Sequence, residues 1–322
     1  MIYDSIAQCI GSTPLVRLQR LFSQAGIEVI AKLELLNPGG SVKDRPAQFI
    51  IEQGLHDGSI TPDTHLIESS SGNFGIALAM LARIYNLSFT CVVDPKISPT
   101  NLHILRQFGA HIEMVQTLDE QGGYLQTRIH RVQQLLQSIP QSYWINQYAN
   151  HLNWLTHFYR TGNEIIQALN EPIDCFIAAV STTGTILGVS RRLRQTYPHI
   201  RIVAVDAAGS VIFGAPAGPR EIPGIGASRV PELLHKDEID EVIYVSDEEA
   251  VQGCRDLVSQ EGIFAGGSSG SVIAGIRKYL AHDSSPCRIV TLLPDRGERY
   301  LDLIYNDEWV ALLADKKKLS VI

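Results

Sequence analysis

Short, continuous apolar runs alternate with longer amphipathic segments along this chain, and few folds accommodate that order. The apolar runs predict strands at residues 29–35, 65–68, 89–93, 111–115, 175–179, 202–205, 242–245 and 288–293. The amphipathic segments predict helices at residues 48–56, 75–85, 101–108, 124–137, 185–195, 247–261 and 271–281. Strands that are apolar on both sides and separated by helices form mostly parallel sheets covered on both faces. The sequence therefore predicts an α/β fold.

The length of the chain predicts two lobes. With 322 residues and 45% hydrophobic content, the chain exceeds what one core usually holds. Irregular polar stretches interrupt the alternation near Gly40 and near Tyr148, which makes these positions the best candidates for lobe boundaries. No internal repeat or low-complexity linker is present.

Charge and composition exclude several classes of protein. The net charge of −7 and the lack of a basic stripe interleaved with aromatics argue against a nucleic-acid partner. No apolar segment approaches a membrane span, and the first residues do not resemble a secretory leader, so we expect a cytoplasmic protein without a membrane partner. The five scattered cysteines predict reduced thiols, and the ten histidines show no metal-ligand spacing, so no metal is expected.

A turn precedes a lysine at residues 37–45, Asn-Pro-Gly-Gly-Ser-Val-Lys-Asp-Arg. Asn-Pro-Gly-Gly cannot continue the apolar run before it, and Ser41 is then expected to cap a helix whose first turn holds Lys43. A helix N-terminus disfavours a cation, which favours the neutral amine of Lys43. Such an amine is the nucleophile that a Schiff base to an aldehyde cofactor requires. An ordinary solvated lysine is the competing interpretation.

Two loops downstream follow predicted strands and open predicted helices, the position in which parallel sheets bind ligands. The first, residues 68–75, offers the hydroxyls of Ser70 and Ser71 and the amide of Asn73, which suit a carboxylate. The second, residues 181–185, is Ser-Thr-Thr-Gly-Thr and suits a phosphate, although it lacks the Gly-Lys-Ser/Thr ending of a P-loop. Taken alone, each loop could also be a simple cap or tight turn.

A third loop, residues 262–271, is rich in glycine and leaves Ser268 as a neutral hydrogen-bond partner for a ring nitrogen. A turn lysine, a carboxylate loop, a phosphate turn and a neutral ring partner together describe pyridoxal 5′-phosphate.

Five motifs carry a family resemblance that spans nearly the whole chain. Asn-Pro-Gly-Gly-Ser-Val-Lys-Asp-Arg, Ser-Ser-Gly-Asn-Phe-Gly, Ser-Thr-Thr-Gly-Thr, Gly-Gly-Ser-Ser-Gly and Pro-Asp-Arg-Gly-Glu-Arg-Tyr occur in the order of the cysteine synthase/cystathionine β-synthase family. The chain resembles these fold-type II (tryptophan synthase β-like) pyridoxal phosphate enzymes. The resemblance implies a homodimer, a large cofactor-binding domain of residues 1–40 and 148–322, and a small mobile domain of residues 41–147.

The resemblance also implies roles for individual residues. Lys43 matches the Schiff-base lysine that moves the α-proton, and Asn73 matches the residue at the phenolic oxygen of the cofactor. Ser268 matches the serine at the pyridine nitrogen. The phosphate-binding residues implied by the family are Ser181, Thr182, Thr183, Gly184 and Thr185, and those that take the substrate carboxylate are Ser70, Ser71 and Gln147.

Residues 93–101, 143–150 and 209–214 most resemble the members of this family that serve siderophore biosynthesis through 2,3-diaminopropionate. The resemblance implies that O-phospho-L-serine and L-glutamate are joined to N-(2-amino-2-carboxyethyl)-L-glutamate, with release of phosphate, through an α-aminoacrylate. Ser181 and Tyr148 depart from the pattern of the common cysteine synthases, and their hydroxyls suit a phosphorylated or polar substrate. Arg128 could bind the phosphate or glutamate, or could be an ordinary residue of a helix surface.

Three other activities share these motifs or this fold. A cysteine synthase would use sulfide with O-phosphoserine or O-acetylserine, and a serine or threonine dehydratase would release a keto acid without a second substrate. A regulatory relative without catalysis would keep only the fold, although Lys43 argues against it.

Overall fold

A computed structural model describes residues 2–119, 123–282, 285 and 287–320, and the side chains up to residue 313 within this range. The chain forms two compact units. Unit 1 contains residues 1–10 and 37–153, and unit 2 contains residues 11–36 and 154–322.

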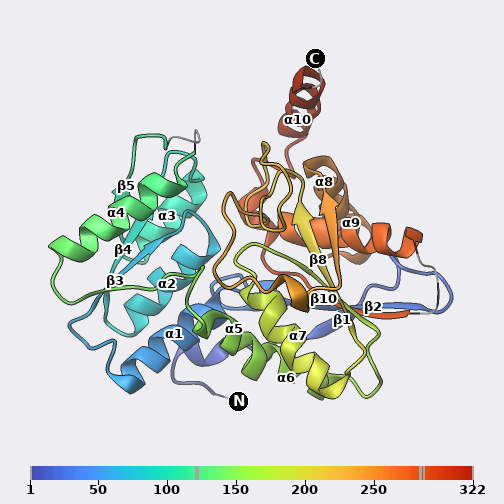
Figure 1. The fold of residues 1–322 in the computed structure, drawn as a ribbon, viewed down its shortest axis with the longest axis horizontal. Coiled ribbons are helices and arrows are strands. Elements are labelled where there is room, and N and C mark those ends of the chain that lie inside the picture. The colour runs from blue at the N-terminus through green and yellow to red at the C-terminus, as the bar shows by residue number, and fades with distance from the viewer. Residues whose placement is uncertain (1, 120–122, 283–284, 286, 321–322) are drawn as a thin grey trace. The chain divides into compact units, whose positions relative to one another are not determined.

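Unit 1 is built on a sheet of four parallel strands in the order β5-β4-β3-β6 (Figure 1). Its strands are β3 (His65–Ser69), β4 (Ser88–Val93), β5 (His111–Met114) and β6 (Ser142–Trp144), and its helices are α1 (Asp44–Asp57), α2 (Asn73–Ile84), α3 (Pro99–Gln107) and α4 (Leu125–Ser138). Neighbouring residues of β3 face opposite sides of the sheet: Leu66 joins the core with α1 and α2, whereas Ile67 packs with Val132 and Leu135 of α4. Both faces of the sheet are therefore apolar, as the continuous apolar runs predicted.

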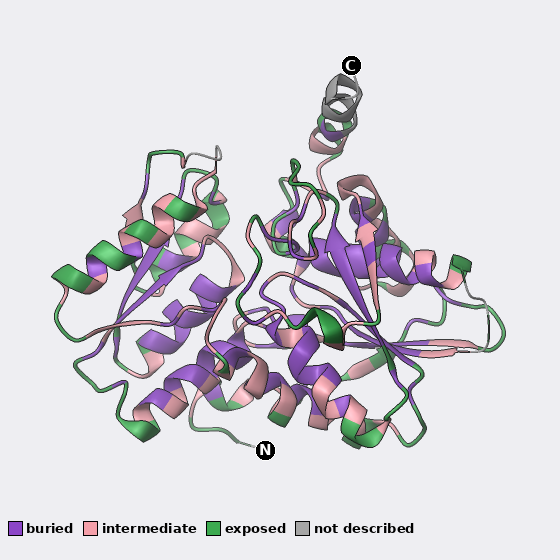
Figure 2. Ribbon diagram, in the orientation of Figure 1, coloured by how far each residue is buried: buried purple, intermediate pink, exposed green. Residues whose placement is uncertain are grey.

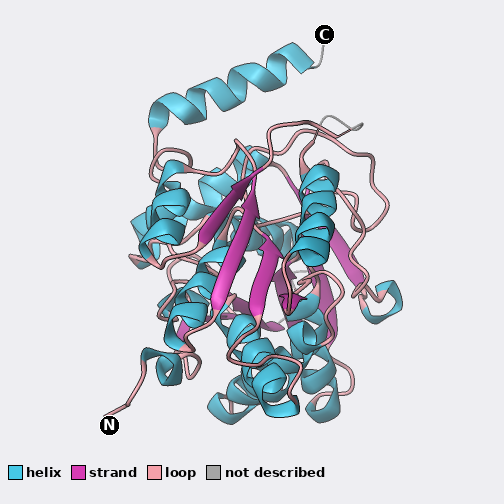
Figure 3. Ribbon diagram, turned by 90° about the vertical axis from the view of Figure 1, so that its left-hand side faces the viewer, coloured by secondary structure: helices cyan, strands magenta, loops and turns pink. Residues whose placement is uncertain are grey.

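Unit 2 is built on a larger sheet in the order β1-β2-β10-β7-β8-β9, in which only β1 runs antiparallel to its neighbour. Its strands are β1 (Leu15–Arg17), β2 (Ile27–Lys32), β7 (Cys175–Ala179), β8 (Arg201–Ala207), β9 (Glu241–Val245) and β10 (Cys287–Leu292). The chain reaches its main part through α5 (Leu152–Thr156), and its other helices are α6 (Asn163–Ala168), α7 (Gly184–Thr196), α8 (Asp247–Asp256), α9 (Gly267–His282) and α10 (Asp307–Ser320) (Figure 3).

Helix α9 contacts β7, β8, β9 and β10, and α8 packs on α9. This arrangement buries a cluster that includes Val203, Val205, Ile273 and Ile289. Figure 2 colours most of the sheet of unit 2 and of α9 as buried. The start of α9, where Ser268 lies, is thereby fixed by the core of unit 2. The predicted α/β class, with mostly parallel sheets flanked by helices, is confirmed.

The first ten residues differ from the expected division of the chain. They were expected in the large lobe, but they belong to unit 1. Ala7 is buried in the core of unit 1, and the amide of Gln48 on α1 donates a hydrogen bond of 2.9 Å to the Ala7 carbonyl. The boundaries also fall after residues 36 and 153, a few residues from the expected positions. Mobility of the small lobe stays a prediction.

Candidate functional site

Lys43 stands immediately before the first residue of α1, at its N-cap position. The turn that leads to it is closed by a hydrogen bond of 2.8 Å from the Gly40 amide to the Asn37 carbonyl. The prediction that Ser41 caps the helix was wrong, because the chain makes one further turn: the Ser41 hydroxyl accepts the Lys43 N–H at 3.2 Å, and the helix begins at Asp44. Lys43 is therefore placed at a helix N-terminus as expected, one position outside the helix.

The carboxylate of Asp44 fixes the turn before Lys43. It accepts the Gly39 N–H at 2.5 Å. A Cβ at position 39 would lie 2.4 Å from Asp44 Oδ1, so only glycine fits beside this carboxylate. Because the turn is closed on both sides of Gly39, the backbone that carries Lys43 has a single defined path.

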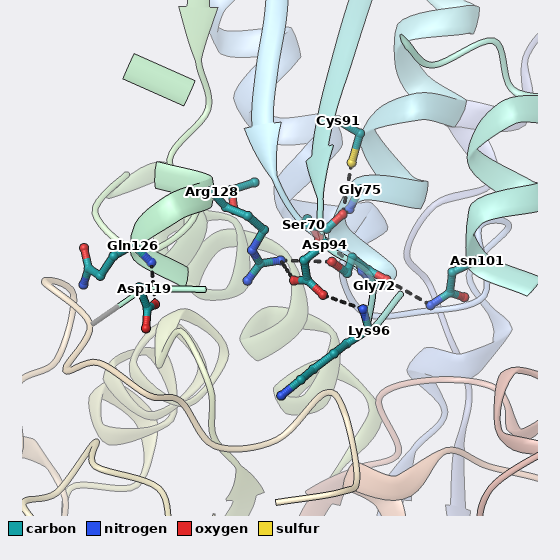
Figure 4. Close-up of polar contacts among 12 residues, drawn as sticks. Ser70, Gly72, Gly75, Cys91, Asp94, Lys96, Asn101, Asp119, Gln126 and Arg128 are labelled. Carbon is teal, nitrogen blue, oxygen red and sulfur yellow. Dashed lines mark hydrogen bonds and ion pairs between the residues drawn. The ribbon is translucent and has the colours of Figure 1, made fainter. Parts of the chain in front are cut away.

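The loop after β3 uses Ser70 to begin α2. The Ser70 hydroxyl accepts the Gly75 N–H at 3.0 Å, and the Cys91 thiol donates to the Ser70 carbonyl at 3.0 Å (Figure 4). A serine hydroxyl has one donor besides its acceptor sites. The capping bond to Gly75 uses an acceptor site, so the Ser70 hydroxyl can still donate to a carboxylate while it caps the helix. Asn73, the first residue of α2, lies one turn from this hydroxyl.

The same loop leaves space beside Gly72, at the N-cap of α2. A Cβ built on Gly72 would meet no atom within 4 Å among the described residues. The first turn of α2 has amide groups without acceptors inside the helix, and its dipole favours an anion. Space and donors together suit a small carboxylate.

Arg128 of α4 reaches this loop and is not a solvated residue of a helix surface. Its Nη1 lies 3.0 Å from the Ser71 hydroxyl and 3.3 Å from an Asp94 carboxylate oxygen, and its side chain is only 17% exposed (Figure 4). The Arg128 Nε is buried without a hydrogen-bond partner among the described residues. Asn101 donates to the Ser71 carbonyl at 3.1 Å, so both the backbone and the side chain of Ser71 are held.

Gln147 is buried in the segment after β6 and is joined to the end of β3 through Glu68, a residue for which the motifs predicted no role. Glu68 is buried at the end of β3; its Oε1 accepts the Ser69 N–H at 2.8 Å and its Oε2 accepts the Gln147 N–H at 3.2 Å. Burial raises the pKa of Glu68 to about 7, although both amide hydrogen bonds lower it. Tyr148, the next residue, is half-buried.

In unit 2, residues 181–185 form the turn between β7 and α7, with Thr183 at the N-cap in a left-handed conformation (φ 64°). The Ser181 hydroxyl donates to the Gly226 carbonyl at 3.1 Å, the Thr183 hydroxyl donates to the Thr182 carbonyl at 2.7 Å, and Thr185 contacts His157 at 3.2 Å. The hydroxyls thus shape the turn. The donors for an anion are then the amide groups of the first turn of α7, which begins at Gly184.

Ser268, the second residue of α9, is buried and bonds to Asp295. Its hydroxyl lies 3.4 Å from Asp295 Oδ1, and the other carboxylate oxygen accepts the Tyr300 hydroxyl at 2.6 Å. Asp295 and Tyr300 belong to the Pro-Asp-Arg-Gly-Glu-Arg-Tyr motif, but the sequence did not indicate that they hold Ser268. The neighbouring Ser269 hydroxyl is buried without a hydrogen-bond partner among the described residues.

Comparison with known proteins decides which cofactor these groups serve. The family described as “Pyridoxal-phosphate dependent enzyme” matches residues 6–295. The chain belongs to this family. It is therefore a pyridoxal phosphate-dependent enzyme of fold-type II.

The relatives of this pyridoxal phosphate enzyme act on amino acids. The chain is 63% identical over 314 residues to N-(2-amino-2-carboxyethyl)-L-glutamate synthase from Ralstonia nicotianae, a match that covers 98% of this chain and 93% of the relative. The O-acetylserine dependent cystathionine β-synthase from Helicobacter pylori has a similar structure, with a TM-score of 0.89, 34% identity, and coverage of 95% of this chain and 100% of that one. A crystal structure of O-ureido-L-serine synthase matches with a TM-score of 0.87 and 31% identity, covering 97% of this chain and 100% of that one.

The residues of each unit fit pyridoxal phosphate. Unit 1 offers an amine at the start of α1, and unit 2 offers a helix N-terminus with small residues for a phosphate and a buried hydroxyl at the start of α9. The unpartnered Ser269 hydroxyl adds a polar group at the same helix end. Among the described residues, no cluster of metal ligands is found, and no helix there is both long and apolar enough to traverse a bilayer.

Proposed function

We propose that this enzyme joins O-phospho-L-serine to L-glutamate, giving N-(2-amino-2-carboxyethyl)-L-glutamate and phosphate. The observation that carries the proposal is the 63% identity, over nearly the whole chain, to a synthase named for this product. The contact between Arg128 and Ser71 supports it, because it adds a cation to the loop proposed to bind the amino-acid substrate. Phosphoserine carries two anionic groups, and a guanidinium binds phosphate well.

The proposed cofactor residues are those that the family resemblance names. Lys43 would hold the aldehyde carbon of the cofactor, Asn73 would hydrogen-bond its phenolic oxygen, residues 181–185 would bind its phosphate, and Ser268 would hydrogen-bond its pyridine nitrogen. When bound, pyridoxal phosphate supplies the electron sink that makes the α-hydrogen of an amino acid acidic. Lys43 would act as the amine base that takes this proton, positioned by the turn at residues 37–42.

Most of the proposed substrate residues lie in unit 1, whereas Ser181 lies in unit 2. Ser70 donates its hydroxyl hydrogen to the substrate carboxylate while it continues to cap α2, and Ser71 and Gln147 complete the carboxylate site. Arg128 binds the phosphate of the donor and stabilises it as it leaves. Tyr148 and Ser181 add hydroxyls that favour a phosphorylated donor over an uncharged ester.

Ser268 sets the course of the reaction. A neutral hydroxyl stabilises a protonated ring nitrogen less than a carboxylate would, so the electron sink is weaker. With this residue at the ring nitrogen, the bound cofactor would favour loss of a good leaving group from the β-carbon of the substrate. Closure of the small lobe would exclude water until the second substrate binds. The proposal includes a cytoplasmic homodimer whose product feeds 2,3-diaminopropionate and siderophore synthesis.

The test is product identification by mass spectrometry. Purified enzyme is incubated with phosphoserine and, separately, with glutamate, sulfide and a panel of other amines, and phosphate release is measured in parallel. We expect one amine adduct, that of glutamate, with ping-pong kinetics. Cysteine as the main product would identify a cysteine synthase, and a keto acid formed without a second substrate would identify a dehydratase; either result refutes the proposal.

A Lys43→Ala variant is the control for the cofactor. It should lose the visible absorption band of the covalently held aldehyde and the release of phosphate together. A variant that keeps both would remove Lys43 from the proposed chemistry.

A further inference from the structure

Glu68 is a buried carboxylate to which the proposed reaction gives no part. It lies at the end of β3 and is only 2% exposed. One oxygen accepts the N–H of Ser69, the next residue and the last of β3, at 2.8 Å, and the other accepts the Gln147 N–H in the segment after β6 at 3.2 Å. The bond to Ser69 orients the Glu68 carboxylate, and the bond to Gln147 ties the segment after β6 to the end of β3.

The segment after β6 needs such a bond because its pairing with β3 ends before it. Strands β3 and β6 pair from His65 to Ile67, and the Ile145 N–H bonds the Ile67 carbonyl at 3.2 Å. Beyond this point, Asn146 adopts a left-handed conformation (φ 50°), which turns the chain out of the strand direction. Past the last backbone hydrogen bond between β3 and β6, the bond from the Gln147 N–H to the Glu68 carboxylate continues to connect the two segments.

The two amides that donate to Glu68 lie next to or within the segments proposed to bind the substrate carboxylate. Ser69 precedes Ser70 and Ser71, and Gln147 is itself one of the proposed carboxylate-binding residues. Among the described residues, no hydrogen bond joins Ser70 or Ser71 to Gln147, whereas Glu68, two residues before Ser70, bonds Gln147 directly. We propose that Glu68 is a positioning residue: its ionised carboxylate holds the segment of residues 146–148 against the end of β3, at the distance from Ser70 and Ser71 at which these residues bind the carboxylate of the amino-acid substrate. This inference rests on the proposed function for the identity of the ligand.

The ionised form is required because of hydrogen-bond chemistry. A carboxylate only accepts hydrogen bonds, whereas a carboxylic acid also presents an O–H donor. If either oxygen is protonated, its O–H group, a donor, faces the amide N–H of Ser69 or Gln147, which is also a donor. One of the two hydrogen bonds is then lost. The affinity for the substrate carboxylate is then lower, although the fold of unit 1 is kept.

The groups around Glu68 place this change near neutral pH. Cys91 of β4, Trp144 of β6 and Arg128 of α4 face it, in addition to the Ser69 and Gln147 amides. Burial raises the pKa of Glu68 to about 7; the amides, the Trp144 side chain and the positive charge of Arg128 lower it but do not offset the burial. The Cys91 thiol is neutral in this range, because burial raises its pKa to about 12.

The experiment compares the wild-type holoenzyme with Glu68→Gln and with a matched control, Glu113→Gln. Glu113 is a carboxylate of the same sheet that is partly exposed and bonds Arg131 at 2.8 Å, away from both loops. Glu68→Gln replaces one acceptor by an amide donor, which imitates protonation at every pH. We expect KM for phosphoserine to rise about tenfold near pH 8, as for one hydrogen bond to a charged group, with kcat within about threefold of wild type.

The dependence of KM on pH separates a positioning role from a structural one. In the wild type and in Glu113→Gln, KM should rise as pH falls from 8 to 6, beyond the change caused by the phosphate of the substrate, whose second pKa is about 6. In Glu68→Gln only the contribution of the phosphate should remain. If Glu68 merely supports the fold, the variant will lose kcat and stability while its KM profile stays parallel to that of the wild type, and the proposal is wrong.

Hydrogen exchange of the holoenzyme tests the inference without any substrate. The amides of residues 69–72 and 146–150 should exchange faster in Glu68→Gln than in Glu113→Gln, with α1 and α3 unchanged. Unchanged exchange in these two segments would overturn the proposal. Failure of the wild type to release phosphate from phosphoserine would instead refute the proposed function and leave the exchange result to decide the role of Glu68.

Discussion

Replacement of Gly270 by alanine should separate α9 from α8 and displace Ser268. Helices α8 and α9 touch through their backbones: a Cβ on Gly270 would lie 2.0 Å from the Ala250 carbonyl oxygen and 2.7 Å from the Cys254 amide nitrogen. A Cβ built on Gly253, on α8, would likewise lie 2.2 Å from the Gly270 carbonyl oxygen. No side-chain rotation relieves these contacts, because the obstructing atoms belong to the main chain.

The geometry gives the size of the effect. Ordinary contact begins at 3.4 Å, so α9 would have to move by about 1.4 Å from α8. Overpacking of a core costs about 1–3 kcal/mol, and the upper part of that range applies because backbone atoms obstruct the methyl group. Alanine in place of glycine within a helix returns up to about 1 kcal/mol. We expect Gly270→Ala to lower the free energy of unfolding by about 2 kcal/mol.

Gly275→Ala is the matched control on the same helix. There, the new Cβ would meet only the Val205 side chain, with Cγ2 at 2.5 Å, and a side chain can adjust. We expect the free energy of unfolding, from urea titration followed by circular dichroism, to change by less than about 1 kcal/mol. Affinity for pyridoxal phosphate should fall in Gly270→Ala alone, because Ser268 lies two residues before position 270. Equal stability of Gly270→Ala and wild type, or equal damage by both variants, would refute the reasoning.

Three further outcomes follow from contacts in the two units. Burial raises the pKa of Glu68 from 4.5 to about 7, so the folded state binds this proton more tightly than the unfolded state. Relative to Glu68→Gln, the wild type should therefore lose roughly 3 kcal/mol of unfolding free energy as pH rises from about 4.5 to 7. Urea titration at each pH measures this difference, and a difference that does not depend on pH would contradict the prediction. Arg128→Met should raise KM for phosphoserine at least about tenfold in steady-state assays. The control Arg131→Met, on the same helix but bonded to Glu113, should leave this KM within about twofold of wild type. Equal effects of the two substitutions would show that Arg128 is not part of the substrate site. Tyr300→Phe removes a hydrogen bond of 2.6 Å to buried Asp295, so it should lower the free energy of unfolding by about 2 kcal/mol. It should also weaken cofactor binding in a fluorescence titration. If both values are unchanged, the position of Asp295 does not depend on the Tyr300 hydroxyl.

The strands with strong apolar patterns could be predicted from the sequence, and short elements could not. The expected strand at residues 175–179 coincides with β7, and that at 65–68 lies within β3. Strands β1 and β6 have three residues each, too few for an alternation to be seen. The expected strand at residues 29–35 extends beyond the end of β2, because the chain leaves the sheet and forms a 3₁₀ helix at Glu34–Leu36 while it is still apolar. The hydrophobic pattern of one strand does not indicate where the strand beside it ends.

The turns at the proposed site were predictable, but their supporting contacts were not. Glycine, proline and hydroxyl residues mark a turn through local backbone preferences, so the loops around Lys43, Ser70 and Ser181 were found in the sequence. The bond from Glu68 to Gln147 joins residues 79 positions apart, and that from Ser268 to Asp295 joins residues 27 positions apart. Such pairs depend on the arrangement of strands in the sheet, which no short window of sequence contains.

The position of β10 in the sheet of unit 2 has a consequence for synthesis on the ribosome. This strand lies between β2 and β7, yet it is the last strand of the chain. As the polypeptide emerges from its N-terminus, β2 must wait for residues 287–292 before its parallel neighbour exists. Unit 1 has all of its residues once position 153 has emerged. The half that carries Lys43 can therefore fold during translation, while the half that carries Ser268 completes its sheet only when the nascent chain is almost finished.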